Sequence, residues 1–372
     1  MTSSITNRSR IGRKEGRRLI AVAILSVATF LNVFYSAQTR QYFGRYLSMN
    51  LGGGECEWTA PVPFIATETK TTRTLLASYP GSGKRLCWRM LEALTGYQAG
   101  DDWDLSLNGV NPPFIKTSYP HPEGTWGWED SMDQVIMVIR NPRYALPSYH
   151  ALRHEIDYSN SWDQSFSHID NTYTKQPPVP VWEDWRDVRF ETEIDLWCWY
   201  IDFWMQDGLR RNDGFNNSFQ DPHCITDLKN CRPKAILQFE KMIASDEDVM
   251  IQELDKMSAV LDASSNMDVI AEEARPCVYK KVLDNKEFYN PRRNGNGPSM
   301  EERKFTYRQL NVMKSEISNM KKKYTIDPFQ DIPLAQDLVV ILDEYIAELS
   351  AEYVTAFQNA NSSPEDTEPG AS

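Results

Sequence analysis

The sequence SYPGSGKRLCW at residues 78–88 narrows the choice of fold more than any other part of the chain. A β-rich run at 74–78 leads into it, and a helical pattern follows it to residue 94. The two glycines around Ser82 permit a tight loop whose backbone N–H groups, together with the helix start, can hold an anion. Strand, loop and helix in this order predict a phosphate-binding α/β unit.

Further β-rich runs alternate with helical patterns along the next part of the chain. The β-rich runs lie at 113–116, 135–139 and 234–239, and helical patterns lie at 246–263 and 334–357. Strands that alternate with helices are typical of a parallel sheet with helices on both faces. The expected fold is therefore an α/β, P-loop-like three-layer domain with a central parallel sheet.

The glycine-rich loop departs from the ATP-binding P-loop, G-x-x-x-x-G-K-[ST]. That pattern needs glycine where this chain has Ser78, and a Mg²⁺-binding hydroxyl where it has Arg85. We therefore expect the loop to hold a phosphate without a metal, with Lys84, Arg85 and Arg89 as countercharges. A nucleotide-dependent kinase is the alternative interpretation.

A second element, RNPRYALPSYH at 140–150, follows the apolar run at 135–139. In an open α/β sheet, ligands bind beyond the carboxyl ends of the strands. Arg140 offers a guanidinium fork to a phosphate, and a turn followed by a helix can return the Ser148 hydroxyl to its side.

Together the two elements resemble the sulfotransferase family, whose members transfer a sulfuryl group from 3′-phosphoadenosine 5′-phosphosulfate (PAPS) and release 3′,5′-ADP. The loop is similar to the family's T-Y-P-K-S-G-T-T-W, which holds the 5′-phosphosulfate. The resemblance thus implies PAPS as the cofactor, with no metal required, and places at it Gly81, Ser82, Gly83, Lys84 and Arg85.

The resemblance extends to the 3′-phosphate of the cofactor. Arg140 and Ser148 match the Arg and Ser of the family's R-N-x-x-D-x-x-x-S element at the same separation. PRRNGNG at 291–297 is similar to the family's Arg-Lys-Gly loop, which implies binding roles for Arg292, Arg293 and Gly295. The resemblance covers residues 73–324, with its middle unmatched.

Two departures from the family pattern bear on catalysis. The family's loop lysine falls at Gly81, so Lys84 is expected to place its charge against the bridging oxygen. The family's base is a histidine in a K-T-H segment, and here that histidine is replaced by Ser118. Serine accepts no proton at neutral pH, so His121 or, failing that, Glu123 is expected to be the catalytic base.

The first part of the chain predicts membrane attachment. Residues 1–18 are basic and precede an uncharged run at 19–35, which at about 1.5 Å per residue gives roughly 25 Å of helix, just enough to span. The positive-inside bias predicts a cytosolic tail at 1–18, a single transmembrane anchor at 19–35 and a lumenal stem at 36–72. A cleaved signal peptide is the alternative.

In a lumenal domain, cysteines can form disulfides and sequons can be glycosylated. Cys224 and Cys231 bracket a short polar segment and are the best candidates for a disulfide, while Cys87 and Cys198 lie in apolar runs as buried thiols. Glycosylation sequons occur at Asn216 and Asn361. The expected location is the Golgi membrane, as a single-pass type II protein.

The remaining regions bear on the acceptor. The lumenal domain is expected at 73–357, with an insertion at about 155–232, and an acidic disordered tail at 358–372. The aromatic face at 197–204 predicts core, and irregular structure at 162–189 could present aromatic rings to a sugar.

Charge and location together suggest the class of acceptor. A net charge of -12 argues against a nucleic-acid partner. The expected acceptor is a hydroxyl of a glycan or glycoprotein. A nucleotide-binding protein without turnover is the other alternative.

Overall fold

Five parallel strands form the centre of the fold, in the order β2-β3-β1-β4-β5. Each neighbouring pair of strands is parallel. The strands are β1 (Thr74–Ser78), β2 (Gly100–Asp101), β3 (Phe114–Thr117), β4 (Gln134–Ile139) and β5 (Pro233–Gln238). The predicted α/β class and central parallel sheet are confirmed.

The computed structural model describes residues 61–62, 72–102, 112–125, 132–159, 177–206, 208, 232–264, 267–284 and 302–362. Within these ranges the α-helices are α2 (Lys84–Thr95), α4 (Pro142–Ser159), α6 (Val179–Met205), α8 (Phe239–Met242), α9 (Glu247–Asp262), α10 (Arg275–Asp284), α12 (Tyr307–Tyr324) and α13 (Ala335–Ser362). Short 3₁₀ helices lie at η2 (Glu272–Ala274) and η3 (Phe329–Asp331).

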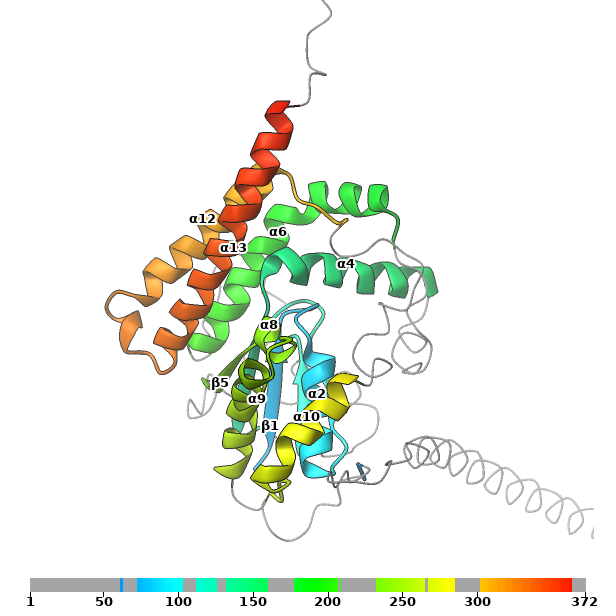
Figure 1. The fold of residues 1–372 in the computed structure, drawn as a ribbon, viewed down its shortest axis with the longest axis vertical. Helices are drawn as coiled ribbons and strands as arrows, with labels where there is room; N and C mark the ends of the chain where they lie inside the picture. Colours follow the sequence, from blue (N-terminus) through cyan, green and yellow to red (C-terminus); the bar gives the residue numbers. More distant parts are fainter. Residues whose placement is uncertain are drawn as a thin grey trace, which may run out of the picture. The chain divides into compact units, whose positions relative to one another are not determined.

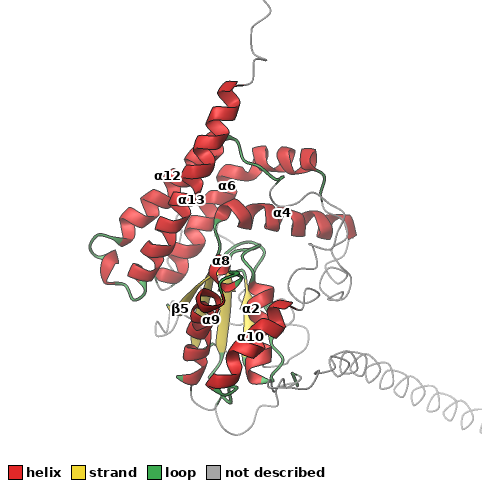
Figure 2. Cartoon of the chain, viewed as in Figure 1, coloured by secondary structure: helices red, strands yellow, loops and turns green. Residues whose placement is uncertain are grey.

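Helices cover both faces of the sheet (Figures 1 and 2). Successive side chains of a strand point to opposite faces, so neighbouring residues of β4 enter different layers. Met137 packs in the cluster formed with α6, α12 and α13, whereas Ile136 and Val138 pack in the cluster formed with α2, α9 and α10. Every residue of β4 is buried, as expected for a strand that is covered on both faces.

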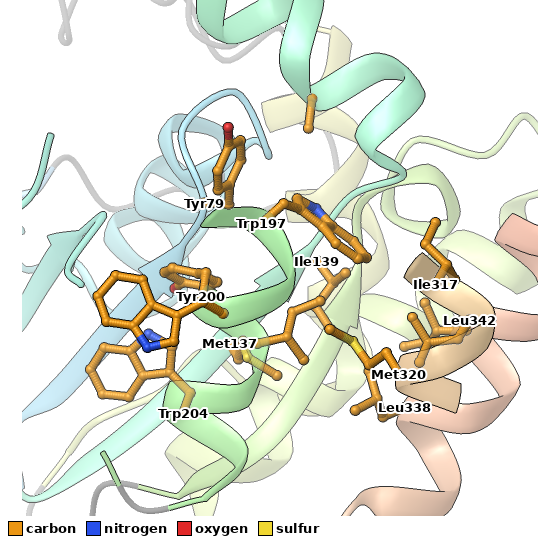
Figure 3. Close-up of a cluster of buried hydrophobic side chains, with 14 of the residues drawn as sticks. Tyr79, Met137, Ile139, Trp197, Tyr200, Trp204, Ile317, Met320, Leu338 and Leu342 are labelled. Atoms are coloured by element: carbon orange, nitrogen blue, oxygen red, sulfur yellow. The ribbon is translucent and has the colours of Figure 1, made fainter. Parts of the chain in front are cut away.

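The first cluster is rich in aromatic side chains from α6 (Figure 3). Trp197, Tyr200, Ile201 and Trp204 are each at most 1% exposed. The prediction that this face is core is confirmed. Replacing a buried tryptophan with alanine costs about 3–5 kcal/mol, so α6 contributes substantially to the stability of this layer.

Local capping signals explain where two of the helices begin. The Asp246 side chain accepts from the backbone N–H groups of Asp248 and Val249 and caps α9. Thr306 and Gln309 form a reciprocal capping box at the start of α12. The boundary predicted for α9 agrees with the structure within one residue at each end, because its cap is a local signal.

Two expectations about irregular structure are wrong. The segment predicted to be irregular contains the first turns of α6, which begin at residue 179, and Trp182 is completely buried. The last helix, α13, continues past the predicted domain end at 357 to Ser362. The remainder of the predicted tail, 363–372, lies outside the described residues.

The predicted membrane anchor at 19–35 and stem at 36–72 lie almost entirely outside the described residues. Among the helices that the structure describes, none combines the length and apolar character needed to span a bilayer. The other predicted domain boundaries and the insertion limits stay predictions.

Candidate functional site

The predicted site residues that follow β1, β3 and β4 lie at the carboxyl edge of the sheet, where parallel strands all end on the same side. The loop after β1 (residues 79–83) enters α2, and Ser118 follows β3. Arg140 follows β4, and Phe239 follows β5. The central position of β1 between β3 and β4 therefore brings the three segments that sequence motifs single out to one place.

The glycine-rich loop has a backbone that only glycine accommodates at two positions. Gly81 and Gly83 have φ angles of +83° and +94°, in the left-handed region that L side chains rarely adopt. A Cβ at Gly81 would lie 2.3 Å from the carbonyl oxygen of Ala145 in α4, and one at Gly83 would lie 2.1 Å from the Phe239 ring. The loop is thus packed directly against the elements that follow β4 and β5.

The same loop presents an anion-binding arrangement. The first N–H groups of α2 have no intrahelical acceptors, and the helix dipole adds partial positive charge at this end. Ser82 is completely buried, and its hydroxyl has no hydrogen-bond partner in the described part of the chain. A buried, unsatisfied hydroxyl costs about 1–3 kcal/mol, and a polar ligand group bound beside the helix start would relieve this cost.

Arg140 lies alongside this loop. Its Nη1 donates to the Gly81 carbonyl oxygen at 2.8 Å, and its guanidinium carbon lies 4.4 Å from the centre of the Phe239 ring. Ser148 lies on α4, next to Tyr149, whose backbone nitrogen would be 2.8 Å from a Cβ at Gly81. The structure thus brings the loop, Arg140 and the Ser148 segment together, as the resemblance implies.

Lys84, the first residue of the helix that follows β1, contacts Ser118, the first residue after β3. The Lys84 Nζ donates to Ser118 Oγ at 2.6 Å. Ser118 is 1% exposed, whereas Lys84 is only partly buried. Ser118, at the position where the pattern that this sequence resembles has a histidine, is therefore in contact with Lys84.

Two acidic residues that sequence analysis missed lie behind this contact. Asp101 forms an ion pair with Lys116, and Asp102 accepts from Thr117 Oγ1 at 2.6 Å and from the Thr125 backbone N–H at 2.9 Å. Burial and the neighbouring Asp101 carboxylate raise the pKa of Asp102 to about 8. Burial also opposes ionisation of Asp101, but the charge of Lys116 holds its pKa below the usual range.

His121 belongs to a buried polar network. Its Nδ1 accepts from the Glu123 backbone N–H at 3.1 Å, and its Nε2 lies 3.3 Å from Glu193 Oε2. The same Glu193 oxygen accepts from the Tyr79 hydroxyl at 2.8 Å. His121 is 2% exposed, so in this conformation both ring nitrogens are occupied by other protein groups.

Glu123 is also engaged. Its carboxylate accepts from the Tyr149 hydroxyl at 2.9 Å and lies 3.2 Å from Arg153 Nη1. The roles of His121 and Glu123 as bases stay predictions. Their contacts direct the His121 imidazole to Glu193 and the Glu123 carboxylate to Tyr149 and Arg153.

The remaining predicted site residues lie on α2 or outside the described residues. Arg85 is partly buried at the start of α2, and Arg89 is turned to an ion pair with Glu92 at 2.5 Å. Arg292, Arg293 and Gly295 lie outside the described residues, as does the proposed Cys224–Cys231 pair. Among the described cysteines Cys87 and Cys198 are free, as predicted, and Cys277 is disulfide-bonded.

Sequence comparison adds little to this geometry. No protein-family model matches the chain, and no curated protein matches it. Among solved structures, the chain is similar to the mouse sulfotransferase SULT7A1 complexed with PAP, at 14% sequence identity and a TM-score of 0.42. The match covers 75% of this chain and 90% of that chain. A likeness this distant does not establish function.

Proposed function

We propose that the chain is a PAPS-dependent sulfotransferase that transfers a sulfuryl group to a hydroxyl of a glycan or glycoprotein in the Golgi lumen. The observation that carries the proposal is the buried, unpartnered hydroxyl of Ser82 at the start of the 12-residue helix α2. It provides a donor for a phosphate oxygen at the end of the helix where the dipole favours negative charge.

The chemistry of the neighbouring residues fits the two phosphate groups of PAPS. Gly81, Ser82 and Gly83 approach a ligand closely because they carry small side chains or none. Arg85 would supply charge at the 5′-phosphosulfate, Lys84 would lie beside it, and Arg140 and Ser148 would bind the 3′-phosphate, as their match to the family pattern implies. PAPS would supply the activated sulfuryl group.

The protein's part in such a transfer is positioning and charge. Sulfuryl transfer should resemble phosphoryl transfer in its loose, in-line transition state. The cationic side chains and the N–H groups of α2 would therefore stabilise charge on the leaving phosphate, and the packed loop would hold it in line with the acceptor.

Two features support a lumenal location. Cys277 on α10 is disulfide-bonded, and disulfides persist in oxidising compartments such as the secretory pathway. Asn361 of the Asn-Ser-Ser sequon is exposed on the last turn of α13. Enzymes in this compartment meet glycans and secreted proteins, which is the basis for the proposed acceptor class.

Thermal unfolding of the full chain tests the cofactor assignment. At 100 times its dissociation constant, 3′,5′-ADP should add about 2.7 kcal/mol of stability. Arg140→Ala should weaken binding of 3′,5′-ADP far more than binding of 5′-AMP, whereas Arg308→Ala on the exposed face of α12 should change neither. Stabilisation by Mg-ATP but not by 3′,5′-ADP would instead favour a kinase, and binding without turnover would favour a non-catalytic protein.

A further inference from the structure

The contact between Lys84 and Ser118 holds the Lys84 amine beside the glycine-rich loop at 79–83. Lys84 is the first residue of α2, and Ser118 is the first residue after β3. Ser118 is 1% exposed and Lys84 is partly buried, so the contact lies inside the protein. The 2.6 Å bond from Lys84 Nζ to Ser118 Oγ uses one N–H of the amine.

The surroundings of Lys84 disfavour its charged form. The amine belongs to the N-terminal residue of a helix, where the helix dipole opposes positive charge. Burial lowers the pKa of Lys84, and the positive charge of Lys116 lowers it further. Three carboxyl groups oppose this shift, namely Asp102, Asp101 and Glu123.

The opposing carboxyl groups are partly neutralised by other partners. Asp101 is ion-paired with Lys116. Asp102 has a pKa raised to about 8 by burial and by Asp101, so near neutral pH it is mostly protonated and carries little charge. Glu123 lies 3.2 Å from the Arg153 guanidinium. Burial and the charge of Lys116 therefore favour the neutral form of Lys84, which is the form of lysine that acts as a base.

We propose that Lys84 is the general base of the transfer and that Ser118, at the position where the sulfotransferase pattern has its histidine, positions the Lys84 amine. This inference rests on the proposed function. It assigns the base to a residue that sequence analysis gave only an electrostatic role.

The proton and electron balance of the step is complete without another reactant. The acceptor hydroxyl gives its proton to the Lys84 lone pair while its oxygen forms a bond to the sulfur. The bond between sulfur and the bridging phosphate oxygen breaks, and its electron pair remains on 3′,5′-ADP. The resulting Lys84 ammonium then neutralises the leaving phosphate and returns its proton to solvent.

The other candidate bases are less suited in this structure. Both ring nitrogens of His121 are occupied, by Glu123 N–H and Glu193. The Glu123 carboxylate accepts from Tyr149 and faces Arg153. Lys84 is the base candidate that lies at the start of α2, where the proposed function places the phosphosulfate.

Lys84→Arg is the sharpest variant, because arginine keeps the positive charge but cannot lose a proton. We expect a fall in kcat of about 10² to 10⁴-fold, the usual share of general-base catalysis. Binding of 3′,5′-ADP should stay close to wild type. The probe reaction is hydrolysis of PAPS by the full chain, in which water replaces the acceptor, followed by a panel of desulfated glycans. Lys280→Met on α10 is the matched control and should keep full activity.

The positioning role of Ser118 is tested by Ser118→Ala and Ser118→His. Loss of the hydroxyl should lower kcat with little change in KM for PAPS, whereas histidine supplies a base of its own and should restore turnover with a pH profile shifted toward the imidazole pKa. A merely structural role would move neither the pH profile nor the ratio of kcat to KM.

A readout without turnover separates this inference from the proposed function. Acetylation of every lysine in the full chain with acetic anhydride, measured by peptide mass spectrometry across pH, reports when each amine becomes neutral. Lys84 should react at lower pH than Lys280. An ordinary titration of Lys84, or an active Lys84→Arg protein, would overturn this inference even if 3′,5′-ADP binds. Failure to bind 3′,5′-ADP would overturn the proposed function instead.

Discussion

A lysine side chain has no room at Gly81, the position where the sulfotransferase pattern has its loop lysine. The φ angle of +83° disfavours any L side chain, and a Cβ would meet the Ala145 carbonyl oxygen at 2.3 Å. The close packing of the loop against α4 is thus a physical reason why this chain has glycine, and no lysine, at position 81. Lys84, three residues further along, is the lysine of this segment.

Gly83→Ala should disrupt the loop. The new methyl group would lie 2.1 Å from the Phe239 ring at a φ of +94°, so we expect a loss of stability of about 1–3 kcal/mol and a large loss of 3′,5′-ADP affinity. Calorimetry and chemical denaturation measure the two effects. Gly96→Ala introduces comparable backbone strain at the other end of α2 and should leave nucleotide affinity unchanged.

Asp102→Asn should change how stability depends on pH. Asp102 has a folded pKa of about 8, against about 3.9 for an unfolded aspartate. Between these values the folded chain keeps a proton that the unfolded chain has lost, so this group makes stability fall as pH rises. Asparagine does not titrate, yet its carbonyl can accept the same bonds from Thr117 and Thr125.

Chemical denaturation at about pH 5 and about pH 8 measures this effect. The wild-type protein should lose stability relative to Asp102→Asn over that interval. Identical pH dependence in the two proteins would show that Asp102 has an ordinary pKa in the folded chain.

At the scale of elements, the sequence predicted those strands and helices whose signals are local. β1 matches its predicted range because a short apolar run ends at a glycine-rich turn, and α9 matches because Asp246 caps it. Helix α6 was missed over its first turns because Pro177, Pro178 and Pro180 suggested irregular structure. Pro180 instead lies in the first turn of α6, where the missing N–H has no cost.

The buried residues of the first turns of α6 explain why apolar periodicity did not reveal them. Trp182, Arg186, Phe190 and Glu193 are buried at spacings of three and four, but two of these four residues are charged. The apolar stripe of a helix is therefore interrupted there, and the 3.6-residue pattern of apolar residues is weak.

The site was predictable only where its residues follow strand ends. Lys84, Ser118 and Arg140 were found because they lie in motifs at the carboxyl edge of the sheet. Asp101 and Asp102 were missed because β2 has only two residues, which is too short for a strand pattern in the sequence. Its position in the sheet depends on pairing with β3. Glu193 was missed because nothing in the sequence links α6 to His121, from which it is separated by 72 positions.

Glu193→Gln tests the connection between α6 and the loop. Burial opposes ionisation of Glu193, but bonds from His121, Tyr79 and Arg189 hold its pKa below the usual range. A depressed pKa contributes stability above the unfolded value of about 4.3, and this contribution is lost as pH falls through the folded value. We expect Glu193→Gln to lose about 1–3 kcal/mol near neutral pH, and less under acidic conditions.

Chemical denaturation across pH provides the measurement. Glu191→Gln, on an exposed position of the same helix, is the control and should behave as wild type. A constant difference between Glu193→Gln and wild type at all pH values would contradict the linkage.

At the scale of the whole molecule, two separate hydrophobic clusters fix the site. The cluster with α6, α12 and α13 and the cluster with α2, α9 and α10 lie on the two faces of the sheet, whose strands contribute alternate side chains to each. The loop at 79–83 leads into α2, which packs in the cluster with α9 and α10. The same loop contacts α4, which packs in the cluster with α6, α12 and α13. The proposed site therefore depends on both layers, and destabilising either should weaken nucleotide binding.

The proposed topology makes a prediction for the complete chain. If residues 19–35 form an uncleaved anchor with the domain in the lumen, the mature protein should keep Met1 and stay with membranes during carbonate extraction. It should also be protected from protease added to sealed vesicles. Asn361 is exposed at the end of α13, so a lumenal domain should carry a glycan there that Asn361→Gln removes. A mature N-terminus near Gln38 would indicate a cleaved signal peptide, whereas protease digestion of the domain in sealed vesicles would contradict the lumenal location itself.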